Sequence, residues 1–273
     1  MASMNGKVVL VTGATDGIGR QTALKLARLG ASVVVHGRSA KKAEAAAAEV
    51  RAAVGEGAVH TAVADLASMA EVRRMADDVV RRFDRLDVLV NNAGVFMHER
   101  RLTEDGLETT FAVNHLAPFL LTLLLLDLLK ASAPSRVVTV SSMVHIRAHP
   151  AFDNLQGETR FRGGYAYNLS KLGNVLFTFE LAERLAGTGV TVNCLHPGVV
   201  ATRLLRTGWH VRGGISTERG AETSVFLASS PEVENVTGKF FSNRHVTEPS
   251  PLAYDRSLRQ RFWVESAWLA GLE

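Results

Sequence analysis

The sequence has little cysteine and no hydrophobic run of membrane-spanning length. Its one cysteine, Cys194, has no partner for an internal disulfide, which is typical of proteins from a reducing compartment. The longest apolar stretch, 116–126, ends at Asp127 and is shorter than the roughly 20 residues that a bilayer requires. The first six residues lack the pattern of a signal peptide. We therefore expect a cytoplasmic protein with no membrane span.

The sequence also lacks a large charge excess and an internal linker. It has 31 Lys and Arg against 27 Asp and Glu, a formal net charge of +4. Basic and acidic residues alternate, as in 71–82, which is typical of solvated helix faces and excludes a nucleic-acid stripe. No Pro/Gly/Ser-rich segment divides the chain, and 47% of the residues are apolar. We expect a single domain over 1–273, because this content can bury one large core.

Short apolar segments alternate with amphipathic ones along the chain. Strands are predicted over 7–12, 32–36, 57–63, 87–91, 136–141, 190–195 and 238–241. Helices are predicted over 17–29, 40–54, 68–83, 103–131, 163–186, 217–229 and 256–270, with Ser39 and Ser68 as N-caps. Continuous apolar strands separated by helices indicate a parallel sheet covered on both faces. The predicted fold class is therefore α/β, a single-domain doubly wound Rossmann fold with about seven parallel strands.

Three glycines lie between the first predicted strand and the first predicted helix. Gly13, Gly17 and Gly19 are spaced G-x-x-x-G-x-G. A tight turn, a close approach of the backbone to a pyrophosphate and helix-on-strand packing each require a residue without Cβ. The N–H groups at the following helix N-terminus can bind phosphate. The segment therefore predicts a dinucleotide site.

This spacing resembles the cofactor signature of the short-chain dehydrogenase/reductase family. Asp65-Leu66, Asn91-Asn92-Ala93-Gly94 and Pro197-Gly198 with Thr202 follow in the family's order, so the resemblance covers nearly the whole chain. It implies a cofactor half over about 1–135 and a catalytic and substrate half over about 136–273. The implied cofactor contacts are Gly13, Thr15, Asp16, Gly17, Ile18, Gly19, Asp65, Leu66, Asn92, Ala93, Gly94, Tyr167, Lys171, Pro197, Gly198, Val200 and Thr202.

The end of the second predicted strand bears on the choice between NADP(H) and NAD(H). An NAD site usually has a carboxylate here for the ribose 2′-OH, but no acid occurs between Asp16 and Glu44. Arg38 follows the strand, and Lys41 and Lys42 are close by. Because a guanidinium binds a 2′-phosphate well, we expect NADP(H) to be preferred, with NAD(H) as the alternative. Several NADP-preferring members of the family have a basic residue at the position of Asp16.

Tyr167 and Lys171 carry the predicted proton chemistry. They are four residues apart and share one face of a predicted helix. A nearby ammonium together with oxidised nicotinamide favours the phenolate, so we expect the two to lower the pKa of Tyr167 from its usual value near 10. The family resemblance adds Ser142, which would bind the substrate oxygen, and Asn114, which would hold a water. Ser141 and Ser142 could each instead be a strand-end hydroxyl, and Tyr165 has no lysine four residues later.

The segment between Ser142 and Tyr167 is longer than is usual in the family. The extra residues, 148–164, resemble those of the retinol dehydrogenase and WW-domain oxidoreductase branch, which implies a lipophilic aldehyde, ketone or alcohol as substrate. Segment 203–216 contains three glycines and is interpreted as a lid or as an ordinary mobile loop. The expected pocket residues are Val95, Phe96, Met143, Val144, Leu204, Leu205 and Trp209.

The predicted helix over 103–131 is apolar on nearly every face from Leu116 to Leu129. A homodimer or homotetramer would cover it; alternatively, 148–164 or the C-terminal helix covers it in a monomer. No metal site is expected, because the nine histidines lack ligand spacing. The expected function is NADPH-dependent reduction of a hydrophobic ketone or aldehyde. The alternatives are an NAD-linked alcohol dehydrogenase and a catalytically silent NADP-binding sensor or scaffold.

Overall fold

A computed structural model describes residues 2–55 and 59–272, which contain one eight-stranded sheet in the order β3-β2-β1-β4-β5-β6-β7-β8. Strands β1 to β7 are parallel, and β8 is antiparallel to β7. The predicted Rossmann fold is confirmed, and β8 is an addition at the sheet edge. The strands are β1 Val8–Val11, β2 Ser32–Gly37, β3 Val59–Val63, β4 Val88–Asn91, β5 Ser135–Val140, β6 Val190–His196, β7 Lys239–Ser242 and β8 His245–Val246.

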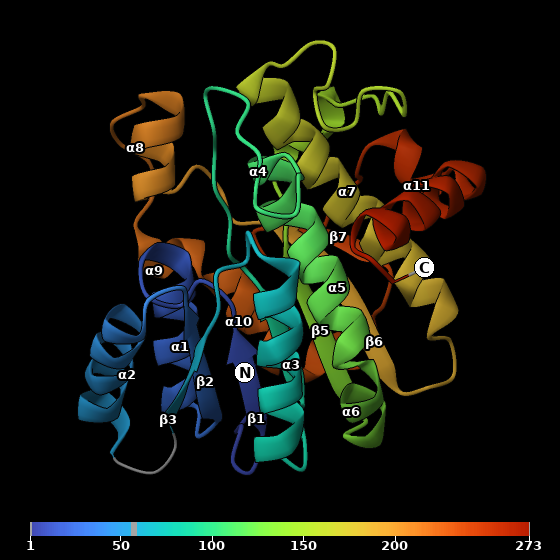
Figure 1. Cartoon of the computed structure of the whole chain (residues 1–273). Helices are drawn as coiled ribbons and strands as arrows, with labels where there is room; N and C mark the ends of the chain where they lie inside the picture. Colours follow the sequence, from blue (N-terminus) through green and yellow to red (C-terminus); the bar gives the residue numbers. More distant parts are fainter. Residues whose placement is uncertain (1, 56–58, 273) are drawn as a thin grey trace.

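Helices cover both faces of the sheet (Figure 1). The core alternates along β1, because Leu10 packs with residues of α3, α5 and α7 while Val9 and Val11 pack with residues of α1, α2 and α10. Both faces of β1 are therefore buried, as expected for a parallel strand. The α-helices are α1 Gly17–Arg28, α2 Ala40–Val54, α3 Met69–Arg82, α4 Thr109–Phe111, α5 Ala117–Leu124, α6 Leu126–Ala131, α7 Gly163–Arg184, α8 Arg203–Trp209, α9 Thr217–Gly220, α10 Glu222–Ser229 and α11 Arg256–Leu269.

The single helix predicted over 103–131 is wrong. Residues 103–106 form a turn that ends at Gly106, whose φ is +75°. The Glu108 carboxylate then accepts hydrogen bonds from the N–H groups of Thr110 and Phe111 and begins α4. A π-helical turn, η1 (Ala112–Leu116), joins α4 to α5, and α6 follows. The change in helical period alters which side chains face the sheet.

Several smaller boundaries also differ. Ser68 caps α3 by accepting the N–H of Glu71, as predicted, whereas Ser39 precedes α2 without a side-chain hydrogen bond. Of the strand predicted over 57–63, the first two residues lie outside the described part, and β3 begins at Val59. The helix predicted over 217–229 is divided into α9 and α10, and α8 was not predicted.

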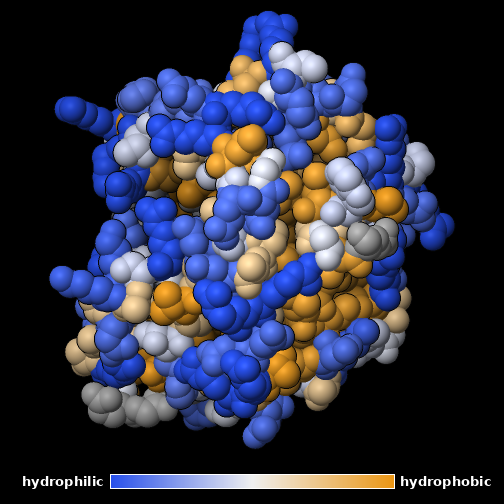
Figure 2. Space-filling view, in the orientation of Figure 1, coloured by the Kyte–Doolittle hydropathy of each residue, from blue (hydrophilic) through white to orange (hydrophobic). Residues whose placement is uncertain are grey.

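The C-terminal helix α11 packs across α7 and reaches α5 (Figure 1). Trp263 of α11 lies 5.0 Å from Phe119 and 5.8 Å from Phe177 between ring centroids. Further along the same surface, several leucines of 123–128 remain only half-buried, and Figure 2 shows a hydrophobic area where α5 and α6 lie. Within residues 2–55 and 59–272, no helix has both the length and the apolar character needed to cross a bilayer.

Candidate active site

The predicted site residues gather at the carboxyl ends of the strands. The sheet order reverses between β1 and β4, with β2 and β3 on one side and β5 to β7 on the other. In doubly wound sheets the crevice outside this reversal is where ligands bind. Gly13 follows β1, Asn92 follows β4 and Ser142 follows β5, so topology alone brings three separate motifs to one edge.

The glycine loop has the close packing that a pyrophosphate cradle requires. Gly13 and Gly17 have φ values of +63° and +56°. A Cβ on Gly13 would lie 2.9 Å from the Cα of Ala93, and a Cβ on Gly19 would lie 2.3 Å from the carbonyl oxygen of Gly13. A larger residue at either position would force the loop away from these neighbours. The residues present therefore fit a bound dinucleotide.

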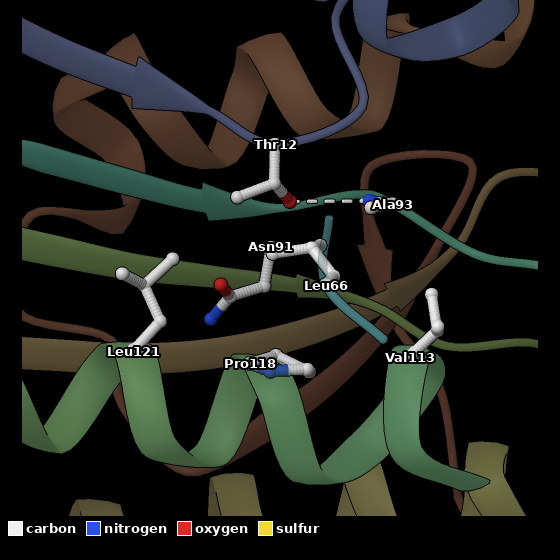
Figure 3. A pocket seen from close by; sticks show the side chains of 7 residues that line it. All are labelled: Thr12, Leu66, Asn91, Ala93, Val113, Pro118 and Leu121. Atoms are coloured by element: carbon white, nitrogen blue, oxygen red, sulfur yellow. Dashed lines mark hydrogen bonds between the residues drawn. The ribbon is translucent and has the colours of Figure 1, made fainter. Parts of the chain in front are cut away.

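Thr12 and Asn92 hold this loop against β4. Thr12 Oγ1 accepts the N–H groups of Asn92 at 2.9 Å and Ala93 at 3.1 Å, and Asn92 Nδ2 donates to the Thr12 carbonyl at 2.9 Å. The Asn92 amide thus positions the loop. Figure 3 shows the Thr12–Ala93 bond above a small pocket between the strand ends and α5. The pocket is lined by Thr12, Leu66, Asn91, Ala93, Val113, Pro118 and Leu121. The role of Thr12 was not predicted.

The loop after β6 lies beside the glycine loop. A Cβ on Gly17 would lie 3.4 Å from the methyl group of Thr202. Val200 and Ile18 both pack around Gly220, 2.7 Å and 3.3 Å from the place of its missing Cβ. Gly198 has a φ of +91°, which lets the chain turn after Pro197. Two motifs that are about 180 residues apart in the sequence therefore meet at one end of α1.

The expected cofactor contacts at the ends of the first three strands differ in exposure: some are bonded or packed within the protein, and others are exposed to solvent. Asp16 caps α1, since its Oδ1 accepts the N–H of Gly17 at 2.7 Å, which explains an acid at this position. Asp65 Oδ1 accepts the N–H of Ala67, while Leu66 is buried in the core. Arg38, in contrast, is exposed immediately after β2.

Other charged and polar groups lie near the end of β2. Lys41 and Lys42 lie exposed in the first turn of α2. Thr15 packs against Gly37, where a Cβ would lie 2.4 Å from the Thr15 methyl group. The end of β2 is therefore closely packed against the glycine loop and presents three cations to solvent.

Tyr167 and Lys171 lie on α7 and are 8% and 3% exposed. Lys171 Nζ donates to the carbonyl of Val140 at 3.0 Å and lies 5.5 Å from the centre of the Tyr167 ring. Burial lowers the pKa of Lys171 to about 8. Burial also raises the pKa of Tyr167 above its ordinary value, opposite to the direction predicted from the lysine. The cost of desolvating the phenolate decides the direction, and the phenol is kept protonated.

Asn114 lies in the π-helical turn η1 and joins three segments. Its Oδ1 accepts the N–H of Val95 at 2.7 Å, and its Nδ2 donates to the Val95 carbonyl at 3.0 Å and to Ser170 Oγ at 3.1 Å. Both N–H donors are therefore used within the protein. A Cβ on Gly94 would lie 3.4 Å from Asn114 Oδ1 and 3.6 Å from Lys171 Nζ. Gly94 thus leaves open the space beside the lysine.

The two serines after β5 differ in their contacts. Ser141 Oγ donates to the backbone carbonyl of Lys171 at 2.8 Å and is a structural hydroxyl. Ser142 begins the 3-10 helix η2 (Met143–Arg147), and its Oγ accepts the N–H of Val144 at 3.4 Å. The Ser142 hydroxyl hydrogen remains able to donate to a ligand. Of the two serines, Ser142 is therefore the one whose hydroxyl hydrogen is available to a substrate oxygen.

The His145 ring links the backbone of Ser142 to that of Ser250. Its Nε2 accepts the N–H of Ser250 at 2.9 Å, so Nδ1 carries the hydrogen and donates to the Ser142 carbonyl at 2.6 Å. Burial lowers the pKa of His145, which favours this neutral form. No local pattern in the sequence indicated this role, because the partner Ser250 lies 105 residues away.

The aromatic rings of Phe96, Tyr167 and Trp209 pack against one another at the site. Phe96 lies 5.7 Å from Tyr167 and 5.0 Å from Trp209, and Trp209 lies 5.7 Å from Tyr167, between ring centroids. Gly208 permits this packing, because a Cβ there would lie 2.9 Å from Phe96. Part of the segment interpreted as a lid is therefore a helix, α8, and it contacts the predicted proton donor.

The remaining pocket residues are less closely associated with Tyr167. Val95 packs against the main core, and Met143 packs against a small cluster that includes Val175 and Phe240. Val144, Leu204 and Leu205 are half-buried. Of the expected pocket residues, Phe96 and Trp209 are the two whose rings contact the Tyr167 ring.

Comparisons with known proteins agree with this geometry. Residues 7–210 match the family described as short chain dehydrogenase. The chain is 46% identical to human retinol dehydrogenase 13, over 100% of this chain and 87% of that protein. An uncharacterized protein from Mycobacterium paratuberculosis superimposes with a TM-score of 0.83 at 33% identity, over 99% of this chain and 96% of that one. A short chain dehydrogenase from Burkholderia cenocepacia, solved with NADP, gives 0.72 at 29% identity, over 88% and 96%.

The chain belongs to the short-chain dehydrogenase/reductase family. Within it, the chain belongs to the branch that resembles the retinol dehydrogenases. It is therefore an NAD(P)-dependent oxidoreductase that acts on CH–OH or C=O groups. This places the glycine loop and the Tyr167–Lys171 pair in the context of nicotinamide chemistry.

Proposed function

We propose that this protein reduces a hydrophobic aldehyde or ketone to an alcohol with NADPH, and that the reaction is reversible. The observation that carries the proposal is the position of Tyr167. Its phenol belongs to a buried helix, beside an ammonium and under two apolar rings. An apolar front with one proton donor suits a hydrophobic carbonyl.

Tyr167 would donate the proton. The glycine loop and Lys171 would hold the dinucleotide, whose nicotinamide would supply the hydride to the carbonyl carbon. As the carbon–oxygen π electrons move to oxygen, the phenolic hydrogen of Tyr167 transfers to that oxygen. Ser142 would donate a hydrogen bond to the same oxygen and orient it. The raised pKa of Tyr167 keeps the donor protonated before reaction.

Lys171 and Asn114 would support the tyrosinate that remains. The Lys171 ammonium stabilises a negative phenolate close by, and with a pKa of about 8 it is mainly protonated at neutral pH. Asn114 fixes the segment after β4 against α7 through Val95 and Ser170. A water held near Lys171 by this asparagine would use the second lone pair of Oδ1.

The direct test is cofactor oxidation. The loss of reduced-cofactor absorbance is followed with NADPH and, separately, with NADH, against a panel of hydrophobic aldehydes and ketones of increasing length. We expect consumption of NADPH that depends on the carbonyl and forms one alcohol per cofactor. Tight NADPH binding with no consumption by any member of the panel would contradict the reductase proposal and favour the sensor.

Arg38 is proposed to read the 2′-phosphate of NADPH. It is exposed at the end of β2, and Lys41 and Lys42 lie in the next helix turn. Arg38→Asp removes a charged hydrogen bond and adds repulsion, so the ratio of kcat/KM for NADPH to that for NADH is expected to fall about 10- to 100-fold. Steady-state kinetics with both cofactors measure the ratio.

Arg160→Asp is the matched control. Arg160 is exposed and lies between η2 and α7, and the substitution changes the charge by the same amount as Arg38→Asp. Its cofactor ratio is expected to stay within about twofold. An unchanged ratio in Arg38→Asp would show that another group reads the phosphate.

Trp209 is proposed to shape the substrate pocket. Its ring contacts both Phe96 and Tyr167. Trp209→Ala is expected to lower kcat/KM for long apolar substrates about tenfold, because an aromatic contact is lost, and to affect short aldehydes less. Trp268→Ala, on the exposed side of α11, is the control. An equal loss for short and long substrates would contradict a pocket role.

The proposal also assigns a role to each half of the chain and a surface to its assembly. Residues of about 1–135 would bind the cofactor, and residues of about 136–273 would supply catalysis and the substrate pocket. Pairing as a homodimer or homotetramer would use the half-buried leucines of 123–128 that α11 leaves uncovered. The assembly and the cytoplasmic location stay predictions.

A further inference from the structure

We propose that His36 is a positioning residue of the cofactor site: it holds the glycine loop and the β3–α3 loop at a fixed separation. The inference rests on the proposed function, since it concerns how NADP(H) is bound. His36 is the penultimate residue of β2 and is only 2% exposed, so it acts on the site through its buried contacts.

His36 bonds to both neighbouring loops. The N–H of Gly13 donates to His36 Nδ1 at 3.1 Å, and His36 Nε2 bonds to the Ala64 carbonyl at 3.0 Å. Its own backbone carbonyl accepts the N–H of Ala14 at 2.9 Å. Gly13 begins the glycine loop, and Ala64 immediately precedes Asp65. One side chain therefore joins the glycine loop to the loop that carries Asp65, an expected cofactor contact.

The contacts define one form of the ring. A nitrogen that accepts an N–H bond carries no hydrogen, so Nδ1 is bare and the hydrogen lies on Nε2, where it can be donated to the Ala64 carbonyl. The protonated ring would present a second N–H directly to the N–H of Gly13. Burial lowers the pKa of His36, which agrees with the neutral ring. Donor and acceptor are thus complementary at both ends.

The bond to Gly13 bears directly on the cradle. Gly13 has a left-handed φ of +63° and packs against Ala93, so its peptide can adopt few other orientations. Without an acceptor at Nδ1 its half-buried N–H loses its partner within the protein, which costs free energy and favours rotation of the peptide. Because this loop leads directly into Gly17 and Gly19 in the first turn of α1, such rotation displaces the N–H groups that would bind pyrophosphate.

Two substitutions separate the two bonds. In Asn the amide oxygen is attached to Cγ, as Nδ1 is in histidine, so His36→Asn keeps an acceptor for Gly13. In Gln the amide nitrogen lies one bond further out, near the place of Nε2, so His36→Gln keeps a donor for Ala64 and loses the Gly13 acceptor. His36→Leu loses both. His60→Leu, on the neighbouring strand β3, controls for removal of a sheet imidazole.

The experiment measures NADPH Kd by fluorescence titration, the thermal midpoint by circular dichroism, and kcat and cofactor KM. His36→Leu and His36→Gln are expected to bind NADPH about tenfold more weakly, with KM raised in parallel and kcat at saturating NADPH within about twofold. His36→Asn and His60→Leu are expected to bind within about threefold of wild type. A purely structural role would instead order the Kd values by thermal midpoint.

Each other outcome is decisive. If His36→Gln binds as tightly as wild type, or if His36→Asn weakens as much as His36→Leu, the positioning role is wrong. If wild type binds neither NADPH nor NADH, both this inference and the proposed function are overturned. If wild type binds NADPH but reduces no carbonyl, the reaction is wrong, and the order of Kd values still decides the role of His36.

Discussion

Replacing Tyr167 by phenylalanine is expected to lower kcat by about 10²- to 10⁴-fold, the usual contribution of a positioned acid. The ring of phenylalanine preserves the contacts with Phe96 and Trp209, while the proton is lost. NADPH Kd is therefore expected to stay within about threefold of wild type. Single-turnover oxidation of NADPH, started by mixing with a carbonyl, isolates the chemical step from product release.

Tyr165→Phe is the matched control for this experiment. Tyr165 lies two residues earlier, and its hydroxyl donates to the backbone carbonyl of His149, outside the aromatic group at the site. The variant loses one hydroxyl from the same helix and is expected to retain turnover within about threefold. Turnover in Tyr167→Phe comparable to that of Tyr165→Phe would exclude Tyr167 as the proton donor.

The parallel sheet could be predicted from the sequence because its strands are short apolar runs between helices. Val9 to Val11 and Val33 to Val35 are fully buried, and runs of this kind are typical of strands covered on both faces. The eighth strand could not be predicted. His245 and Val246 are exposed and form a two-residue edge strand, too short for any alternation to be visible.

The interrupted helix shows where local pattern fails. Apolar residues from Leu116 to Leu129 support a helix, but nothing in their spacing indicates the π-helical turn before them. That turn brings Asn114 to Val95 and Ser170, and both partners come from other segments. α4 begins at Thr109 because the Glu108 carboxylate caps it. The helix therefore does not extend back to residue 103, contrary to the prediction from the sequence.

The site shows the same limit at the level of chemistry. The spacing of Tyr167 and Lys171 predicted that they share a helix face, and α7 confirms that placement. It could not predict the direction of the tyrosine pKa, because the tyrosine is buried by distant residues that include Phe96 and Trp209, 71 positions before and 42 after it. Thr12 and His36 were missed because their partners are distant in sequence and their bonds go to backbone atoms.

The helix that carries Tyr167 and Lys171 is held at its far end by a buried cation. Arg259 of α11 and Glu180 of α7 are 5% and 4% exposed and lie 3.4 Å apart. Arg259 also pairs with Glu183 and donates to the carbonyl of Ala253 at 2.9 Å. Arg184 pairs with the other oxygen of Glu180. Glu180 is therefore a buried carboxylate that depends on two arginines, of which only Arg259 is itself buried.

Arg259→Met is expected to lower the free energy of unfolding by about 3–5 kcal/mol, because it leaves Glu180 buried with only a half-exposed partner. Urea denaturation followed by circular dichroism measures the change. Arg256→Met removes an arginine one turn earlier, which is largely exposed and 3.7 Å from Glu183, and is expected to cost less than about 1 kcal/mol.

Comparison of the two variants distinguishes a buried pair from general loss of charge on α11. Equal, small losses would show that Arg184 and solvent satisfy Glu180 without Arg259. In that case Arg259→Met with Glu180→Gln would be no more stable than Arg259→Met alone. If the unpaired carboxylate is the cause, neutralising it in the double variant should recover part of the loss, because removal of the charge removes its desolvation cost. The recovery thus assigns the energy to Glu180 and to the attachment of α11 to the helix that carries the predicted proton donor.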